Sequence, residues 1–302
     1  MKKIVFFLLS LTIIGCKNQT EVNEKLSVVT TTTMITDLVK NIGGDMIEVN
    51  GLMGAGVDPH LYKASEGDVS KLYNADIIFY NGLHLEGKLV EVFEKMESSD
   101  KAQVALADLL DKSGLVGSEY FASNYDPHVW FNIDYFKEFA SNVAKVLSEK
   151  DPANASVYKL NEQQYQKKLD GLKIEILATV AKLPEEKRIL VTAHDAFNYF
   201  GSAYNFQVVG LQGLSTATEA GVQDVQRLSD FIIDNDVKAI FVESSVPRRT
   251  IEALEQAVRS RDHEVKIGGS LYSDALGDPG TEEGTYIGMF RYNVNTIVNE
   301  LK

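Results

Sequence analysis

Residues 151–184 read DPANASVYKLNEQQYQKKLDGLKIEILATVAKLP, and this stretch divides the chain into two similar halves. Its apolar residues recur every three to five positions, which is typical of one face of an α-helix. They are Val157, Leu160, Tyr165, Leu169, Leu172, Ile176, Leu177 and Val180. A helix over 153–183 spans roughly 45 Å at a rise of about 1.5 Å per residue, and it exceeds the average globular helix of about 10–14 residues. The pattern therefore predicts a helix long enough to join two domains.

Short runs rich in β-branched residues alternate with helical periods on both sides of this helix. The expected strands lie at 27–33, 47–52, 76–80, 102–106, 188–193, 206–211, 239–243 and 264–267. The helices between them include one at 86–96, and a last helix at 286–301 closes the chain. This alternation is typical of βαβ units with a mostly parallel sheet.

We therefore expect an α/β protein of two lobes, each with a mostly parallel sheet flanked by helices and joined by one long rigid helix. The predicted boundaries are 27–150 for the N-terminal lobe, 151–184 for the linking helix and 185–302 for the C-terminal lobe. A cleft between two lobes is a favoured place for a ligand.

Two loops of the first half carry the same short motif, Asp58-Pro59-His60 and Asp126-Pro127-His128. Proline fixes its own φ angle and restricts the residue before it, so each motif is a stiff loop that aims an imidazole in one direction. His194 follows the expected strand 188–193, at the kind of position where open α/β sheets bind ligands. Because imidazole is the commonest metal ligand in proteins, His60, His128 and His194 are candidates for one metal site.

The remaining histidines have less promising surroundings. His84 lies between two leucines, which favours a structural role, and His263 lies in a charged turn, which favours a solvated side chain. A fourth ligand would close a site without sulfur, and Asp274 in the Gly-rich loop 268–280 is the candidate. A single loop aspartate often caps a turn instead, so both roles of Asp274 remain open at this point.

Three further carboxylates have possible supporting roles. Asp58 and Asp126 are expected to accept backbone N–H groups of their own loops, in the manner of Asx turns. Glu243 ends an expected strand, so it either orients a cleft histidine, as carboxylates often do for ligand imidazoles, or lies on the surface.

The N-terminus has the features of an export signal. Lys2 and Lys3 precede an apolar run over 4–14, which is shorter than the roughly 20 residues that a membrane-spanning helix needs. Cys16, the single cysteine, follows Gly15 as in a bacterial lipobox, where the signal is cut before a cysteine that becomes lipidated. The alternative is an ordinary signal peptide with a chance cysteine.

We predict a signal peptide at 1–15, and a lipidated Cys16 with a polar tether over 16–26. The protein would then be exported and held at a membrane by its N-terminal lipid, facing the periplasm or the cell exterior. A single cysteine permits no internal disulfide, so stability has to come from the hydrophobic core.

The charge of the chain excludes one class of partner. The formal net charge is −13, and removal of residues 1–15, with Lys2 and Lys3, leaves −15. Nucleic-acid binding needs clustered lysine and arginine side chains to contact phosphates, so we expect no nucleic-acid partner. We also expect the mature protein to be a monomer.

Six segments occur in an order that resembles the zinc- and manganese-binding solute-binding lipoproteins of bacterial ABC importers, the TroA-like cluster A-I family. They are Val57–His60, Asp126–Trp130, Thr192–Phe200, Gly210–Thr216, Leu271–Gly277 and Gly284–Asn293. Each segment alone is weak evidence, whereas the ordered set is specific and covers the chain from about Ser27 to its end. The resemblance implies four metal ligands in a cleft between the lobes, at His60, His128, His194 and Asp274. It also implies delivery of the ion to a membrane permease.

The identity of the ion is a separate question. Three imidazoles and one carboxylate suit Zn²⁺, whereas Mn²⁺ prefers more oxygen ligands. Some manganese-specific members of the family have a carboxylate in place of His194, which also favours zinc here. Many zinc members carry a loop rich in histidine and acidic residues, and the corresponding stretch 107–127 lacks it. We therefore expect zinc, with manganese or dual use as the alternative.

Two other functions compete with metal capture. A secreted zinc-dependent hydrolase usually keeps one metal position open for water, whereas a fourth protein ligand would close the site, and the sequence has no His-Glu-x-x-His motif. A surface adhesin is the second alternative, although the sequence has no repeats or stalk in its support. We expect a binding protein and not an enzyme.

Overall fold

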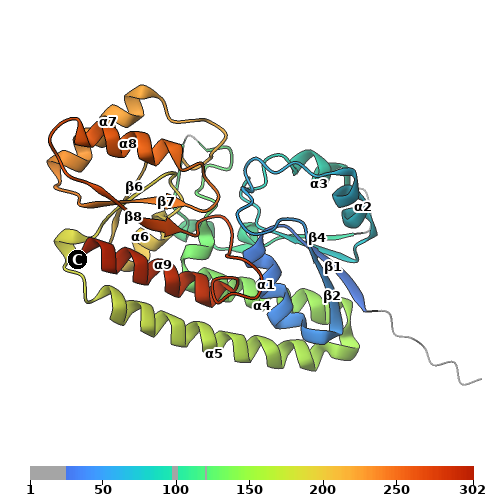
Figure 1. Cartoon of the computed structure of the whole chain (residues 1–302). Helices are drawn as coiled ribbons and strands as arrows, with labels where there is room; N and C mark the ends of the chain where they lie inside the picture. Colours follow the sequence, from blue (N-terminus) through green and yellow to red (C-terminus); the bar gives the residue numbers. More distant parts are fainter. Residues whose placement is uncertain (1–24, 97–100, 120) are drawn as a thin grey trace, which may run out of the picture.

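The computed structural model describes residues 25–96, 101–119 and 121–302. Two α/β lobes lie side by side, and a long helix runs beneath both of them (Figure 1). The predicted two-lobed α/β fold with a joining helix is confirmed. The predicted signal peptide at 1–15 and the predicted lipidation site at Cys16 lie outside the described residues. Among the residues that are described, no helix is both long and apolar enough to cross a membrane.

The first lobe is built on a four-stranded parallel sheet with the strand order β2-β1-β3-β4. Its strands are β1 (Leu26–Thr30), β2 (Ile47–Gly51), β3 (Ile77–Tyr80) and β4 (Ala102–Ala105), and its helices are α1 (Thr33–Gly43), α2 (Glu66–Asn74), α3 (Val90–Met96) and α4 (Ile133–Lys150). Val28 of β1 aligns with Val49 of β2 and Ile77 of β3. β-Branched side chains therefore line up across three strands, as is usual in a buried parallel sheet.

The second lobe contains two parallel strand pairs, β5 with β6 and β7 with β8, and β5 lies beside β7. Its strands are β5 (Ile189–Thr192), β6 (Gln207–Gly210), β7 (Ala239–Glu243) and β8 (Lys266–Leu271), and its helices are α6 (Asn198–Tyr204), α7 (Val222–Asp234), α8 (Arg249–Arg259) and α9 (Tyr286–Leu301). Every residue of β7 is buried. This is the pattern of a strand that is covered on both faces.

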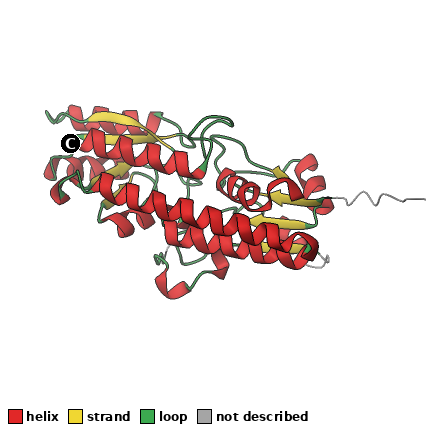
Figure 2. Ribbon diagram, turned by 90° about the horizontal axis from the view of Figure 1, so that it is seen from below, coloured by secondary structure: helices red, strands yellow, loops and turns green. Residues whose placement is uncertain are grey.

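The long helix α5 (Ala155–Val180) is shorter at both ends than the predicted 153–183. A 3₁₀ turn at Pro152–Asn154 precedes it, and Pro184 disfavours helical geometry just beyond its end. Its 26 residues still span about 39 Å. α5 packs against α1 and α4 of the first lobe and α9 of the second. Seen from below, the longest helices run along the length of the molecule (Figure 2).

One hydrophobic cluster runs through both lobes along α5. It includes Phe79 of the first sheet, Leu169 of α5 and Phe241 of the second lobe. The rings of Phe136 on α4 and Tyr286 on α9 stack with their centroids 3.7 Å apart. Protein interiors of this kind are close-packed. The lobes therefore cannot separate on the α5 side without exposing a shared core.

Histidine and carboxylate side chains lie at or just after the carboxyl ends of several strands, between the two lobes. His60 lies in the loop after β2, and His194 lies two residues after β5. Glu243 is the last residue of β7, and Asp274 lies in the loop after β8. Parallel strands gather their carboxyl ends at one edge of a sheet, which is where open α/β sheets bind ligands. This arrangement explains how segments distant in sequence come together.

Candidate metal centre

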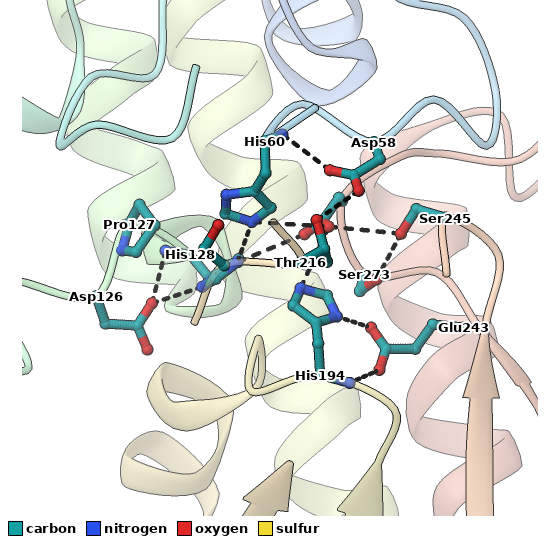
Figure 3. Close-up of polar contacts among 12 residues, drawn as sticks. Asp58, His60, Asp126, Pro127, His128, His194, Thr216, Glu243, Ser245 and Ser273 are labelled. Atoms are coloured by element: carbon teal, nitrogen blue, oxygen red, sulfur yellow. Dashed lines mark hydrogen bonds and ion pairs between the residues drawn. The ribbon is translucent and has the colours of Figure 1, made fainter. Parts of the chain in front are cut away.

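Four side chains meet between the lobes, and each lobe supplies two of them. His60 and His128 come from the first lobe, and His194 comes from the second (Figure 3). The fourth, Asp274, lies after β8 in the second lobe. One nitrogen or oxygen atom of each lies within 4.8 Å of the corresponding atoms of the other three. The structure thus brings together all four residues that the sequence analysis proposed.

The distances within this cluster suit a bound ion. His60 Nε2 lies 3.3 Å from His128 Nε2, and the Asp274 carboxylate lies 3.2 Å from His194 Nε2 and 3.6 Å from His128 Nε2. Zinc bonds of about 2.0–2.1 Å in a tetrahedral arrangement would place the ligand atoms about 3.3 Å apart. These three separations are close to this value, whereas His60 Nε2 and Asp274 Oδ2 are 4.0 Å apart.

The four residues are removed from solvent. His128 and His194 are 0% exposed, Asp274 is 1% exposed and His60 is 4% exposed. Among the described residues, Asp274 Oδ1 and both ring nitrogens of His194 are buried without a hydrogen-bond partner. The 3.2 Å approach of Asp274 Oδ2 to His194 Nε2 is an ion-pair contact. Buried charges are costly unless they are paired or coordinate a metal. Nitrogen and oxygen atoms that face one another without hydrogen-bond partners could serve as ligands of a divalent cation.

A carboxylate holds the ring of His128 from behind. Asp126 Oδ1 accepts the backbone N–H of His128 at 2.9 Å and lies 2.7 Å from its Nδ1. Asp126 is itself fixed, since the Asn198 side-chain amide donates to its Oδ2 and the Tyr199 hydroxyl donates to its carbonyl. A hydrogen bond at Nδ1 leaves the Nε2 lone pair free for a metal and fixes the orientation of the ring.

Glu243 holds the backbone of His194 in the same way and forms an ion-pair contact with its ring. Its Oε1 accepts the His194 backbone N–H at 2.8 Å, and its Oε2 lies 2.5 Å from His194 Nδ1. Glu243 is 4% exposed. Of the two roles that the sequence left open for this residue, the structure shows the one that orients a cleft histidine.

His60 is held through its backbone. Asp58 Oδ1 accepts the His60 N–H at 2.8 Å, as the Asx-turn prediction required. The second oxygen, Asp58 Oδ2, accepts the hydroxyl of Thr216 from the other lobe at 2.5 Å. The sequence analysis assigned no role to Thr216, although this residue ends the recognised segment Gly210–Thr216. A contact between positions 158 residues apart leaves no local signal in the sequence.

The electrostatics of the site favour a cation. Burial, aided by the two neighbouring imidazoles, lowers the pKa of His60 to about 3, so its ring is neutral and able to bind a metal. Burial opposes the charged form of His194, but the carboxylates of Asp274 and Glu243 outweigh it and raise the pKa of His194 well above its usual value. The pKa of Asp274 is lowered against the effect of burial, mainly by His194. In the absence of metal, a proton on His194 therefore supplies the positive charge between these carboxylates.

The two remaining histidines lie outside the cluster. His84 occupies a turn with a φ of 64°, and its side chain is exposed rather than packed between the flanking leucines. His263 is half-buried, and its Nε2 lies 3.4 Å from the carbonyl oxygen of Val237, so it is only partly solvated.

Comparison with known proteins agrees with this geometry. The family described as zinc-uptake complex component A, periplasmic, matches residues 28–300. The manganese-binding lipoprotein MntA of Bacillus subtilis (strain 168) is 44% identical over 305 residues, which cover 100% of this chain and 98% of that protein. The zinc-binding protein TroA of Treponema pallidum (strain Nichols) is 48% identical over 274 residues, which cover 91% of this chain and 88% of that protein.

A solved structure of the periplasmic zinc-binding protein TroA from Treponema pallidum matches with a TM-score of 0.89 over 92% of this chain and 99% of that chain. The relatives are substrate-binding components of transporters, so the expectation of a binding protein and not an enzyme is confirmed, and the hydrolase alternative finds no support. The relatives' names include both zinc and manganese, which leaves the ion open. The chain belongs to the family described as zinc-uptake complex component A, periplasmic.

Proposed function

We propose that this protein captures a divalent transition metal outside the cytoplasm, with zinc favoured over manganese, and delivers it to the membrane permease of an ABC importer. The proposed ligands are His60, His128, His194 and Asp274. The observation that carries the proposal is the convergence of three imidazole nitrogens and one carboxylate in a buried cluster between the lobes. One chain supplies all four ligands, so we propose that the protein binds the ion as a monomer.

The chemistry of the ligands supports zinc. Imidazole and carboxylate ligands in a set of four are typical of closed zinc sites, and they leave no open position for the water of a hydrolytic site. Manganese prefers more oxygen ligands. The 44% identity with a manganese-binding lipoprotein supports manganese as the second candidate. Zinc has the higher intrinsic affinity for such ligands, so the two ions have to be compared in direct competition.

The experiment is elemental analysis after competition dialysis. Metal-stripped protein is dialysed against equal free concentrations of Zn²⁺ and Mn²⁺, with His194→Glu treated in parallel. We expect about one zinc per wild-type chain, and a shift toward manganese in the variant because an oxygen ligand replaces a nitrogen. Stoichiometric manganese in the wild type would overturn the choice of zinc. A wild-type protein that retains neither metal would overturn the function itself and return attention to the adhesin alternative.

Lipidation of Cys16 is the proposed means of retention at the membrane. Cys16→Ser should move the protein from the membrane fraction to the soluble fraction, because the thiol that carries the lipid is gone. The distribution is measured by fractionation and immunoblotting. A variant that stays in the membrane fraction would contradict the lipid anchor and leave the metal site unaffected.

A further inference from the structure

Thr216 lies outside the four-residue cluster, yet a single carboxylate ties it to His60. Asp58 accepts the His60 backbone N–H with Oδ1 at 2.8 Å and the Thr216 hydroxyl with Oδ2 at 2.5 Å. Asp58 and His60 belong to the loop after β2 in the first lobe, whereas Thr216 belongs to the loop between β6 and α7 in the second. The contact therefore joins the two lobes immediately beside one of the proposed ligands (Figure 3).

His60 has the weakest ring support of the three histidines in the cluster. The rings of His128 and His194 each have a carboxylate oxygen at Nδ1, at 2.7 Å and 2.5 Å. Asp58 instead holds the backbone N–H of His60. His60 is also the most exposed of the four, and its Nε2 lies 4.0 Å from Asp274 Oδ2, compared with 3.2 Å for His194 Nε2. The position of the His60 ring therefore depends on the residues that fix the Asp58 carboxylate, and Thr216 is one of them.

Two of the other contacts between the lobes are of a different kind. The Trp130 indole N–H donates to the carbonyl of Ser273 at 3.0 Å, and the Tyr286 hydroxyl donates to the carbonyl of Trp130 at 2.7 Å. These contacts are buried and lie within the core that the lobes share. The contact between Asp58 and Thr216 joins two loop side chains, and Asp58 is only half-buried. Contacts between partly exposed loops open more readily than contacts in a core.

We propose that Thr216 is a positioning residue that slows the release of bound metal. Its hydroxyl fixes Asp58, and through Asp58 it fixes His60, when the two lobes are closed around the ion. Without this bond, the loop 58–60 is free to move away and take one of the four ligands with it. The inference rests on the proposed metal-binding function. Because the bond would hold one ligand of the bound ion in place, we expect its loss to act on dissociation rather than on association.

The test is a comparison of Thr216→Val with Thr216→Ser. Valine keeps the shape of threonine but has no hydroxyl, whereas serine keeps the hydroxyl. We expect Thr216→Val to release Zn²⁺ to an excess of chromogenic chelator about 10- to 100-fold faster than the wild type, as is usual when a group supporting a metal ligand is lost. The association rate should stay within about twofold. Thr216→Ser should restore slow release, which a loss of packing alone would not predict.

A matched control and a double variant sharpen the test. Thr250→Val removes another threonine hydroxyl, which donates to the Pro247 carbonyl at the start of α8, and release should not change. Since Thr216 acts through Asp58, Thr216→Val should add less than about twofold to the effect of Asp58→Ala.

Unchanged release from Thr216→Val, failure of Thr216→Ser to restore it, or additive effects with Asp58→Ala would each overturn the inference. A wild-type protein that binds neither Zn²⁺ nor Mn²⁺ would overturn the proposed function instead. The two failures are therefore distinguishable within one set of measurements.

Discussion

At the scale of single residues, the same Asp-Pro-His motif is used in two ways. In the second copy, the Asp126 carboxylate holds both the backbone and the ring of His128. In the first copy, one oxygen of the Asp58 carboxylate accepts the backbone N–H of His60, and the other accepts the hydroxyl of Thr216 in the second lobe. The ring of His128 is therefore held by its own motif, whereas the ring of His60 is not. In both copies the second carboxylate oxygen accepts a hydrogen bond from the opposite lobe, from Asn198 and from Thr216.

The first prediction at this scale concerns His128. His128→Ala removes one of four proposed ligands from the centre of the cluster, so the affinity for Zn²⁺ should fall by roughly a hundredfold or more. Affinity is measured by competition with a chelator of known strength, and circular dichroism should remain nearly unchanged. His84→Ala is the matched control, because His84 is exposed and lies outside the cluster. Full affinity in His128→Ala would contradict the assigned site.

The second prediction concerns pH. The carboxylates around His194 raise its pKa well above 6.5, so in the metal-free protein this ring holds a proton near neutral pH. A metal has to displace that proton, whereas His60, with a pKa of about 3, is already neutral. Binding of Zn²⁺ at pH 7 should therefore release about one proton, and the affinity should rise about tenfold per pH unit through the neutral range.

Calorimetry in two buffers of different ionisation enthalpy measures this proton release directly. An affinity that is flat between about pH 6 and 8 would contradict the protonated state of His194 in the metal-free protein.

At the scale of elements, the helix α5 gives the two lobes a common support. It packs against α1 and α4 on one side of the molecule and α9 on the other. Arg291 of α9 adds a bidentate ion pair with Glu175 of α5, with N–O distances of 2.7 and 3.0 Å. A single continuous helix is stiffer than a flexible hinge, so changes between the lobes should be small and concentrated in loops.

A break in α5 should therefore destabilise both lobes together. Lys167→Pro places proline at an exposed position in the middle of the helix, where it removes a backbone hydrogen bond and clashes with the preceding turn. The free energy of unfolding should fall by about 3 kcal/mol or more, whereas Lys167→Ala should change it by less than about 0.5 kcal/mol. Urea denaturation of both variants measures the difference. Equal stability of the two variants would show that α5 is not a structural support.

At the scale of the whole molecule, the lobes are joined by packing on one side and by the proposed ion on the other. The shared hydrophobic cluster lies along α5, while the histidines and Asp274 lie between the strand ends. Each lobe supplies two of the four proposed ligands. Metal binding should therefore stabilise the folded molecule as one unit.

This stabilisation predicts a higher melting temperature in the presence of metal. A ligand that binds only the native state adds about 2.7 kcal/mol of stability at a free concentration of 100 times Kd. The melting temperature of stripped protein should therefore rise on addition of Zn²⁺, as measured by calorimetry, and His128→Ala should lose most of this rise. No shift with either Zn²⁺ or Mn²⁺ at saturation would contradict a metal-binding role.

Much of the fold was predictable from local patterns. The strand predicted at 239–243 and the helix predicted at 286–301 have the observed boundaries of β7 and α9. The helix predicted at 86–96 begins only at Val90. The reason is tertiary, because the buried Glu86 carboxylate accepts the Thr31 hydroxyl and the backbone N–H groups of Asn81 and Gly82, which holds the preceding residues in a turn.

The sequence alone determined the α/β alternation, the long helix and the two stiff histidine loops, because hydrophobic periodicity and proline geometry act over a few residues. Only the tertiary structure decided that Glu243 faces His194 and that Thr216 bonds Asp58, across 49 and 158 positions of the chain. Such pairs depend on which strand lies beside which and on how the two lobes meet. No local pattern records that arrangement, since it is fixed by the packing of the whole chain around α5.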